Sequence, residues 1–374
     1  MSGVNKLRVL QVVPALGNGG TERVVFNYCM KIIPDIEFDF AVRSLPENGV
    51  LERPLLEAGC NVFYIGTIKD DSKGCIRKLE EIICNGNYDI VHDHSDCRAF
   101  FSMRIAKKNG VRVRIAHSHF AFVNENLRNR IVRAVFTPLT KLYATDLFAC
   151  GKDAAVWGWG ARAASVGRVH ILNNAVDLEC FSYSVEKRLE KRKELGIGQE
   201  LVICNIGRVC YQKNHELLIN IFQRIREKET DAKLLLVGTG ELIEEVRAQV
   251  NRLSLSKSVF FLGARKDIPD LLSASDVFVL TSRYEGLPVV LVEAQANGIP
   301  CVVSDTVTRE IGVTNIIQYV PAEGDLSMWE EVIWQCRNMR DAQQAEKVRL
   351  SGYDLTTESI RLKEYYFCLV ERYN

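Results

Sequence analysis

The sequence predicts an α/β fold built from two Rossmann-like, doubly wound domains that face a shared cleft. Short runs rich in Val, Ile and Leu recur along the chain between longer amphipathic stretches. These runs are continuous rather than alternating, which indicates strands buried on both faces of a parallel sheet. Repeated strand-then-helix order implies right-handed βαβ units. The length of 374 residues fits two domains of about 100–200 residues each.

Two separate series of such runs define the domains. The first domain is expected over residues 1–180, and the second over residues 199–356. The charged segment 181–198 between them is interpreted as a linker that contains a short helix, and residues 357–374 form a final amphipathic helix. Strands are predicted at residues 7–13, 38–42, 62–65, 90–92, 113–116, 147–150 and 169–172, and then at 201–206, 233–237, 259–262, 277–280 and 301–303.

The composition excludes several protein classes. Apolar residues at 47% and charged residues at 25% exclude a disordered chain, a collagen-like repeat and a small disulfide scaffold. No apolar run approaches the roughly 18 residues of a membrane span, and the run after Arg8 is too short for a secretory signal. The twelve cysteines include no C-x-x-C pair. We interpret them as free packing thiols of a cytoplasmic protein.

The net charge of +1 conceals an uneven distribution of charge along the chain. Residues 98–141 contain ten basic residues and only one acid, Glu125, for a net charge of +9. The first domain therefore carries a basic surface. The near-neutral whole chain indicates no nucleic-acid partner.

A glycine-rich loop follows the first strand. Gly17, Gly19 and Gly20 allow a ligand to approach the backbone closely, and the next helix offers its N-terminus to an anion. A dinucleotide fingerprint would need a third glycine where Glu22 stands, and an acid after the second strand where Arg43 stands. The alternative to a ligand-binding loop is a plain tight turn.

Two histidine pairs follow neighbouring strands. His92 and His94 end one strand, and His117 and His119 end the next, so alternate side chains of each pair point the same way. Three interpretations are open: a zinc site, structural polar residues, or a histidine that faces the substrate. We favour the last, and choose His119 because it lies furthest out on its loop.

Two cations mark the loop after the strand at 201–206. Arg208 and Lys213 are five residues apart, and a helix begins near Asn214. Such a pair suits a diphosphate; the alternative is a solvated surface pair.

The loop after the strand at 277–280 carries the most specific pattern. Pro288 suits the first position of a helix, whose N-terminus exposes the N–H groups of Gly286 and Leu287. Glu293, about one and a half turns in, can accept two hydrogen bonds from the vicinal diol of a ribose. Glu285 can bind hydroxyl groups of a second sugar. Carboxylates near a helix N-terminus can also be merely stabilising.

Together these motifs resemble the retaining glycosyltransferases of family four, which have the GT-B fold. The resemblance covers nearly the whole chain, and its strongest part is a Glu-x₇-Glu signature. One departure is Ala175, where glycine is usual. The finer resemblance is to bacterial exopolysaccharide and capsular polysaccharide enzymes, through RIAHSHF, RYEGLPVVLVEAQANGIP and VTREIGVTN together. The matching segments are GNGGTERVV, NIGRVCYQKNHELLI, LLLVGTGEL, YEGLPVVLVEAQANGIPCVVSD and NNAVDLECF.

The resemblance implies roles in the second domain. Arg208 and Lys213 would bind the diphosphate of the donor. Glu293 would bind the ribose of the nucleotide, and Glu285 the donor sugar. The loop that carries Arg265 would lie near the base.

The resemblance also implies roles in the first domain. Gly19 and Gly20 would approach the phosphate and the sugar. His119 would contact the sugar near the reacting carbon, with His117 as its competitor. The final helix would return to this domain.

The implied reaction is retaining transfer from a nucleoside-diphosphate sugar, with uracil the first choice of base and guanine the second. Cations and helix dipoles would stabilise the leaving group without a metal; the sequence has no Asp-x-Asp motif. No cofactor is expected beyond the donor substrate.

The implied acceptor is a sugar, expected to be linked to polyprenyl diphosphate, at the cytoplasmic face of the plasma membrane. Residues 127–136 could then lie on anionic lipid; the alternative is a basic solvated face. Three other functions are open: a nucleotide-sugar 2-epimerase of the same architecture, a dehydrogenase, and a non-catalytic nucleotide-sugar binding protein.

Overall fold

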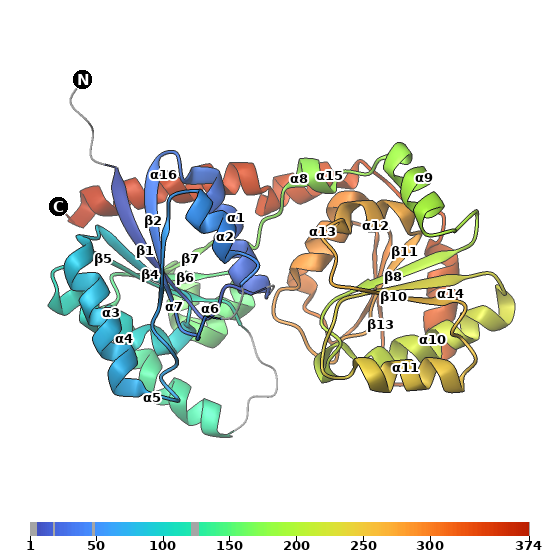
Figure 1. The fold of residues 1–374 in the computed structure, drawn as a ribbon, viewed down its shortest axis with the longest axis horizontal. Coiled ribbons are helices and arrows are strands. Elements are labelled where there is room, and N and C mark those ends of the chain that lie inside the picture. Colours follow the sequence, from blue (N-terminus) through green and yellow to red (C-terminus); the bar gives the residue numbers. More distant parts are fainter. Residues whose placement is uncertain (1–5, 18, 47–48, 121–126, 374) are drawn as a thin grey trace. The chain divides into compact units, whose positions relative to one another are not determined.

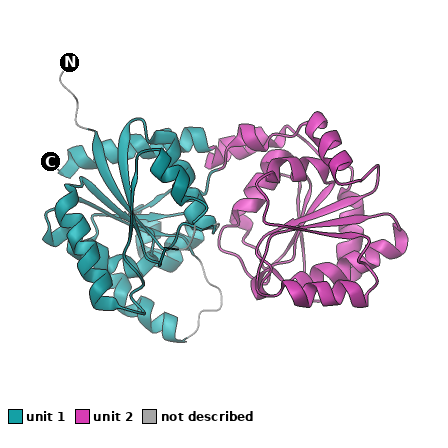
Figure 2. Ribbon diagram, viewed as in Figure 1, with its two compact units in different colours: residues 1–175, 355–374 teal, residues 176–354 magenta. Residues whose placement is uncertain are grey.

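The computed structural model describes residues 6–17, 19–46, 49–120 and 127–373. The chain forms two compact units (Figures 1 and 2). The first unit comprises residues 1–175 and 355–374, and the second comprises residues 176–354. Each unit is a parallel sheet with helices on both faces, so the predicted α/β class with two doubly wound sheets is confirmed.

The sheet of the first unit has seven strands in the order β3-β2-β1-β4-β5-β6-β7. The chain builds outward from β1 in one direction and then crosses back to β4, and Val12 of β1 pairs with Asp93 of β4. Ligands of such sheets bind at the carboxyl ends of the strands where the direction reverses. The strands are β1 (Leu7–Val13), β2 (Ile36–Val42), β3 (Asn61–Tyr64), β4 (Ile90–Asp93), β5 (Val113–Ser118), β6 (Asp146–Ala149) and β7 (Val169–Ile171).

The helices of the first unit include the last helix of the chain. This helix, α16, buries Leu362, Tyr366 and Leu369 against the unit. The helices are α1 (Gly20–Ile32), α2 (Glu52–Glu57), α3 (Ser72–Gly86), η1 (Asp96–Ala99), α4 (Phe100–Lys108), α5 (Leu127–Tyr143), α6 (Lys152–Trp159), α7 (Ala161–Ser165) and α16 (Leu355–Tyr373).

The sheet of the second unit has six strands in the order β10-β9-β8-β11-β12-β13. Its edge strand β13 escaped the sequence analysis, because it has four residues and alternates an exposed Gln318 with more buried neighbours. The strands are β8 (Val202–Ile206), β9 (Lys233–Val237), β10 (Val259–Gly263), β11 (Val277–Leu280), β12 (Cys301–Ser304) and β13 (Ile317–Val320).

Separate apolar clusters cover the two faces of this sheet. Phe222 and Trp329 pack with strand residues in one cluster, and Leu291 packs with Phe278 in another. The helices of the unit are α8 (Leu178–Phe181), α9 (Val185–Glu194), η2 (Tyr211–Lys213), α10 (His215–Lys228), α11 (Ile243–Arg252), α12 (Ile268–Ala274), α13 (Val289–Asn297), η3 (Arg309–Ile311), α14 (Leu326–Cys336), α15 (Gln344–Val348) and η4 (Arg349–Tyr353).

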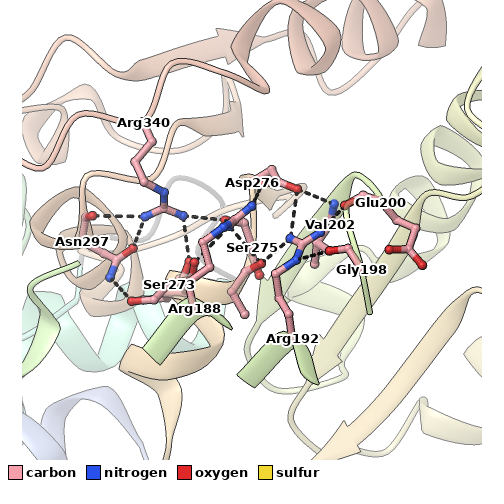
Figure 3. A network of polar contacts seen from close by, with 12 residues as sticks. Arg188, Arg192, Gly198, Glu200, Val202, Ser273, Ser275, Asp276, Asn297 and Arg340 are labelled. Carbon is pink, nitrogen blue, oxygen red and sulfur yellow. Dashed lines mark hydrogen bonds and ion pairs between the residues drawn. The ribbon is translucent and has the colours of Figure 1, made fainter. Parts of the chain in front are cut away.

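The segment expected to be a linker is instead an anchored part of the second unit (Figure 3). Arg188 of α9 donates to the carbonyl oxygens of residues 273–275 at 3.0–3.1 Å and pairs with Asp276 at 2.6 Å. Arg192 donates to the carbonyl of Ala274 at 2.8 Å. These carbonyls end α12, where cations are stabilised by the helix dipole. The unit boundaries at 175/176 and 354/355 therefore differ from those expected from the charged composition of residues 181–198.

All twelve cysteines are free, and most of them are buried, in agreement with a packing role. Among the described residues, none of the helices combines the length and the apolar character needed to cross a bilayer.

Candidate functional site

The glycine loop of the first unit leads directly into α1. Gly19 is the N-cap residue, in an extended conformation, and as a glycine it has no side chain to cap the first turn. The helix N-terminus therefore keeps backbone N–H groups that can bind an anion. A Cβ atom on Gly19 would lie 2.1 Å from Oε2 of Glu22. The side chain of Glu22, which stands where a dinucleotide fingerprint has its third glycine, therefore folds back over Gly19.

The two histidine pairs form one buried array. Their rings stack within each pair, with centroids 4.2 Å apart for His92 and His94 and 4.0 Å apart for His117 and His119. Hydrogen bonds join the pairs across the strands: His92 Nε2 lies 3.1 Å from His117 Nδ1, and His94 Nδ1 lies 2.9 Å from His119 Nε2. The prediction that alternate histidines point the same way is confirmed.

Burial keeps these rings neutral. It lowers the pKa of all four histidines, and that of His119 falls to about 3. Because His119 is only 6% exposed, it is less accessible than its place at the end of β5 suggested.

Three supporting residues escaped the sequence analysis. Asp96 accepts hydrogen bonds from the backbone N–H of His119 at 3.0 Å and from Ser118 at 2.9 Å, and its burial raises its pKa to about 6. Gln11 and Tyr366 bind the rings of the array from β1 and α16. Tyr366 is 274 positions from its partner His92, so no local pattern could have identified it.

The array also has a donor set that suits a metal. Nitrogens of His92, His94 and His117 lie within 4.8 Å of one another. Three neutral imidazoles are zinc ligands in many proteins. In this structure both ring nitrogens of His92 and of His94, and Nδ1 of His117, already contact another ring or a neighbouring polar side chain.

In the second unit, two predicted site residues meet in a buried ion pair. Lys213 Nζ lies 2.6 Å from Glu285 Oε1, and their side chains are only 14% and 6% exposed. Glu285 also accepts hydrogen bonds from Ser282 at 2.5 Å and Gln212 at 3.1 Å. The loops that carry these residues follow β8 and β11, which are neighbours in the sheet, so the pair lies at the carboxyl ends of the strands.

Arg208 lies in a more open environment. Its side chain is 73% exposed and pairs with Glu241 at 3.1 Å, a carboxylate that the sequence analysis missed.

The turn before Glu241 packs tightly on the loop of Arg208. Cβ atoms on Gly238 and Gly240 would lie 1.9 Å and 2.1 Å from the carbonyl oxygens of Gly207 and Val209. Only glycine fits both positions, which explains the glycine turn in LLLVGTGEL.

Helix α13 begins one residue later than predicted. Pro288 is its N-cap, and Gly298 ends it in the left-handed conformation. Glu293 lies half-buried in its second turn, and Gly286 and Leu287 lie half-buried in the loop before it.

Arg265 is held by acidic neighbours. It binds both carboxylate oxygens of Asp267, at 2.7 and 2.6 Å, and lies 3.3 Å from Glu194. These carboxylates raise the pKa of Arg265 and keep its guanidinium fixed. Its expected place near a nucleotide base stays a prediction.

Comparison with known proteins now decides the family. Residues 187–315 match the family described as Glycosyl transferases group 1. The Bacillus subtilis protein EpsF, described as a glycosyltransferase, is 32% identical over 375 residues, which cover 94% of this chain and 97% of EpsF. The chain belongs to the group 1 glycosyltransferases.

Other proteins are also similar to this glycosyltransferase over most of its length. An Escherichia coli protein named UDP-Gal:alpha-D-GlcNAc-diphosphoundecaprenol alpha-1,3-galactosyltransferase is 30% identical over 321 residues, covering 80% of this chain and 79% of its own. The crystal structure of Anabaena Alr3699/HepE in complex with UDP matches with a TM-score of 0.79 at 18% identity, covering 96% of this chain and 99% of that one. The architecture of two parallel sheets thus matches GT-B glycosyltransferase structures.

Proposed function

We propose that this glycosyltransferase moves a sugar, with retention of anomeric configuration and without a metal, from a UDP-sugar to a lipid-linked sugar acceptor. The product would belong to an exopolysaccharide or capsular polysaccharide. The buried Lys213–Glu285 pair at the strand ends of the second unit carries the proposal. UDP and UDP-glucose in complexes of Anabaena HepE, and the lipid-linked acceptor in the name of the Escherichia coli relative, support the substrate classes.

The proposed roles follow from charge. When the bond between the anomeric carbon and the diphosphate breaks, negative charge develops on the leaving phosphate. Lys213 and Arg208 stabilise that charge. The acceptor oxygen forms the new bond to the anomeric carbon, and its proton passes to the leaving phosphate.

The carboxylates and one histidine position the donor in this proposal. Glu293 accepts hydrogen bonds from the ribose diol, and Glu285 from a hydroxyl of the sugar. His119 of the first unit contacts the sugar. Gly19 and Gly20 approach it through their backbone.

Helix α5 supports contact with a membrane surface. Leu127, Ile131 and Val135 are 71%, 57% and 53% exposed, at intervals of four residues along one face of the helix. Arg128 and Arg130 are exposed beside them. An apolar face flanked by cations suits the interface of an anionic bilayer. Glu125, the acid of this basic stretch, lies outside the described residues.

The function is tested by incubating the protein with a panel of nucleoside-diphosphate sugars, first alone and then with a polyprenyl-diphosphate-linked sugar. We expect one UDP-sugar to raise the melting temperature and to yield a lengthened lipid-linked glycan. Formation of an epimerised nucleotide sugar from the donor alone would contradict transfer. Binding without any product would indicate a non-catalytic protein.

A further inference from the structure

The hydrogen bonds of the histidine array start from one amide, that of Gln11 on β1. Its Oε1 lies 2.8 Å from His94 Nε2, and its Nε2 lies 3.3 Å from the hydroxyl oxygen of Tyr366. An amide oxygen only accepts and an amide nitrogen only donates. The two sides of Gln11 therefore impose opposite hydrogen-bond directions on the groups that they touch.

The first series of hydrogen bonds runs through His94 to His119. Because the amide oxygen accepts, His94 carries its proton on Nε2. A neutral ring has one proton, so His94 Nδ1 must accept from His119 Nε2–H across their 2.9 Å contact. This leaves His119 Nδ1 as a bare acceptor. That atom is buried and has no hydrogen-bond partner among the described residues.

The second series runs through Tyr366 and His92 to His117. The Tyr366 oxygen accepts from Gln11, and its own proton goes to His92 Nδ1, 2.7 Å away. The reverse direction would leave the hydroxyl proton of the fully buried Tyr366 unpaired, at a cost of about 1–3 kcal/mol. His92 then donates from Nε2 to His117 Nδ1 at 3.1 Å.

The second series ends with a donor. His117 carries its proton on Nε2, and this N–H is also buried without a partner among the residues that the structure describes. The rings of His117 and His119 stack with centroids 4.0 Å apart. Two neighbouring rings thus hold one unused donor and one unused acceptor, both buried.

We propose that Gln11 and Tyr366 are positioning residues that fix all four histidines as Nε2–H tautomers, so that His117 and His119 together bind one hydroxyl group. A hydroxyl both accepts and donates, which satisfies the two unused atoms at once. Assigning the hydroxyl to the donor sugar rests on the proposed function. The tautomers themselves do not.

The tautomers are measured on the unmodified protein. Selective ¹⁵N labelling of the six histidines and long-range ¹H–¹⁵N spectra distinguish the two ring nitrogens, and single histidine variants assign the signals. We expect neutral Nε2–H rings at all four positions. An Nδ1–H tautomer at His117 or His119 would overturn the proposal, as would one equivalent of tightly bound zinc with the ring nitrogens as ligands.

The variant Tyr366→Phe tests control by α16. We expect His92 and His117 to lose their single tautomer while His94 and His119 keep theirs. Tyr365→Phe is the matched control, because Tyr365 stacks on His170 at 4.1 Å and its hydroxyl lies outside the two series. Unchanged spectra in Tyr366→Phe would refute the assigned role.

Binding measurements identify the hydroxyl. We expect Tyr366→Phe to bind the UDP-sugar about 3–10-fold more weakly and to bind UDP, which lacks the sugar, unchanged. Equal effects on both ligands, or none on either, would overturn the sugar as the ligand. Absence of UDP-sugar binding to the unmodified protein would refute the proposed function while the spectra still decide the array.

Discussion

The substitution Glu285→Gln separates the structural and functional parts of the buried ion pair. Gln keeps a side-chain oxygen near Lys213 and Ser282 but removes the negative charge. A hydrogen bond to a charged group contributes about 1.5–3 kcal/mol, against about 1 kcal/mol for a neutral one. Because Lys213 and Glu285 are only 14% and 6% exposed, solvent screens their attraction little. We therefore expect the free energy of unfolding to fall by about 2 kcal/mol.

That loss is measurable by thermal unfolding. About 1 kcal/mol shifts the melting temperature of a unit of this size by roughly 2–4 °C, so a decrease of about 4–8 °C is expected for the transition of the second unit. The control is Glu241→Gln, which breaks the exposed pair with Arg208. With side chains 73% and 53% exposed, that pair should contribute at most about 1 kcal/mol.

The functional part is measured by the UDP affinity and the transfer rate of Glu285→Gln. UDP should bind at least as tightly as before, since Lys213 no longer has a competing carboxylate. The rate of sugar transfer should fall by an order of magnitude or more, because the sugar loses a charged acceptor. A parallel loss of UDP affinity would refute the assignment of Glu285 to the sugar. An unchanged melting temperature would refute the energetic reasoning.

Three further outcomes are expected. Glu293→Gln should weaken UDP binding about tenfold in calorimetry, since it removes a charged acceptor for the ribose, and unchanged affinity would contradict that role. Lowering the pH from 7 to 5 should destabilise the protein, because burial lowers the pKa of His119 in the folded state to about 3, whereas the unfolded chain takes up the proton below about pH 6.5. The free energy of unfolding should fall by about 2 kcal/mol for such a histidine by pH 5. Chemical denaturation of His119→Asn should show a weaker pH dependence. Ile131→Glu should reduce co-sedimentation with vesicles containing phosphatidylglycerol, whereas Leu350→Glu, a change at a 79% exposed residue of the second unit, should not; equal effects would contradict contact through α5.

Much of the fold follows from local patterns. Continuous apolar runs predicted all seven strands of the first sheet and five of the six in the second. A glycine also stands where α13 ends, because the left-handed conformation of Gly298, with φ of 72°, is readily available to glycine. Edge strand β13 was missed because a half-exposed strand lacks the continuous apolar run of a central one.

The site was predictable only where its residues share a loop. Lys213 and Glu285 each follow a strand, and neighbouring strand ends bring them together. Glu241 pairs with Arg208 on the loop after another strand, and Gln11 of β1 contacts His94 at the end of β4. The contact between Tyr366 and His92 depends on how α16 packs on the first unit. The segment 181–198 was misjudged for a similar reason. Its charged composition favoured a linker, because the partners of its arginines, the carbonyls that end α12, are backbone atoms that no composition reveals.

The two predicted phosphate-binding cations differ in how they are held, and this difference bears on catalysis. Arg208 sits in an exposed pair, so exchanging Glu241 for a diphosphate costs little. Lys213 is largely desolvated and held by Glu285, so in the proposed function its ammonium must leave this carboxylate to bind a phosphate oxygen. When Lys213 turns to the phosphate, Glu285 keeps hydrogen bonds from Ser282 and Gln212 and is not left unpaired. In the proposed function, the carboxylate then accepts a hydrogen bond from a sugar hydroxyl in the place that Lys213 leaves, so the release of Lys213 and the binding of the sugar are parts of one exchange.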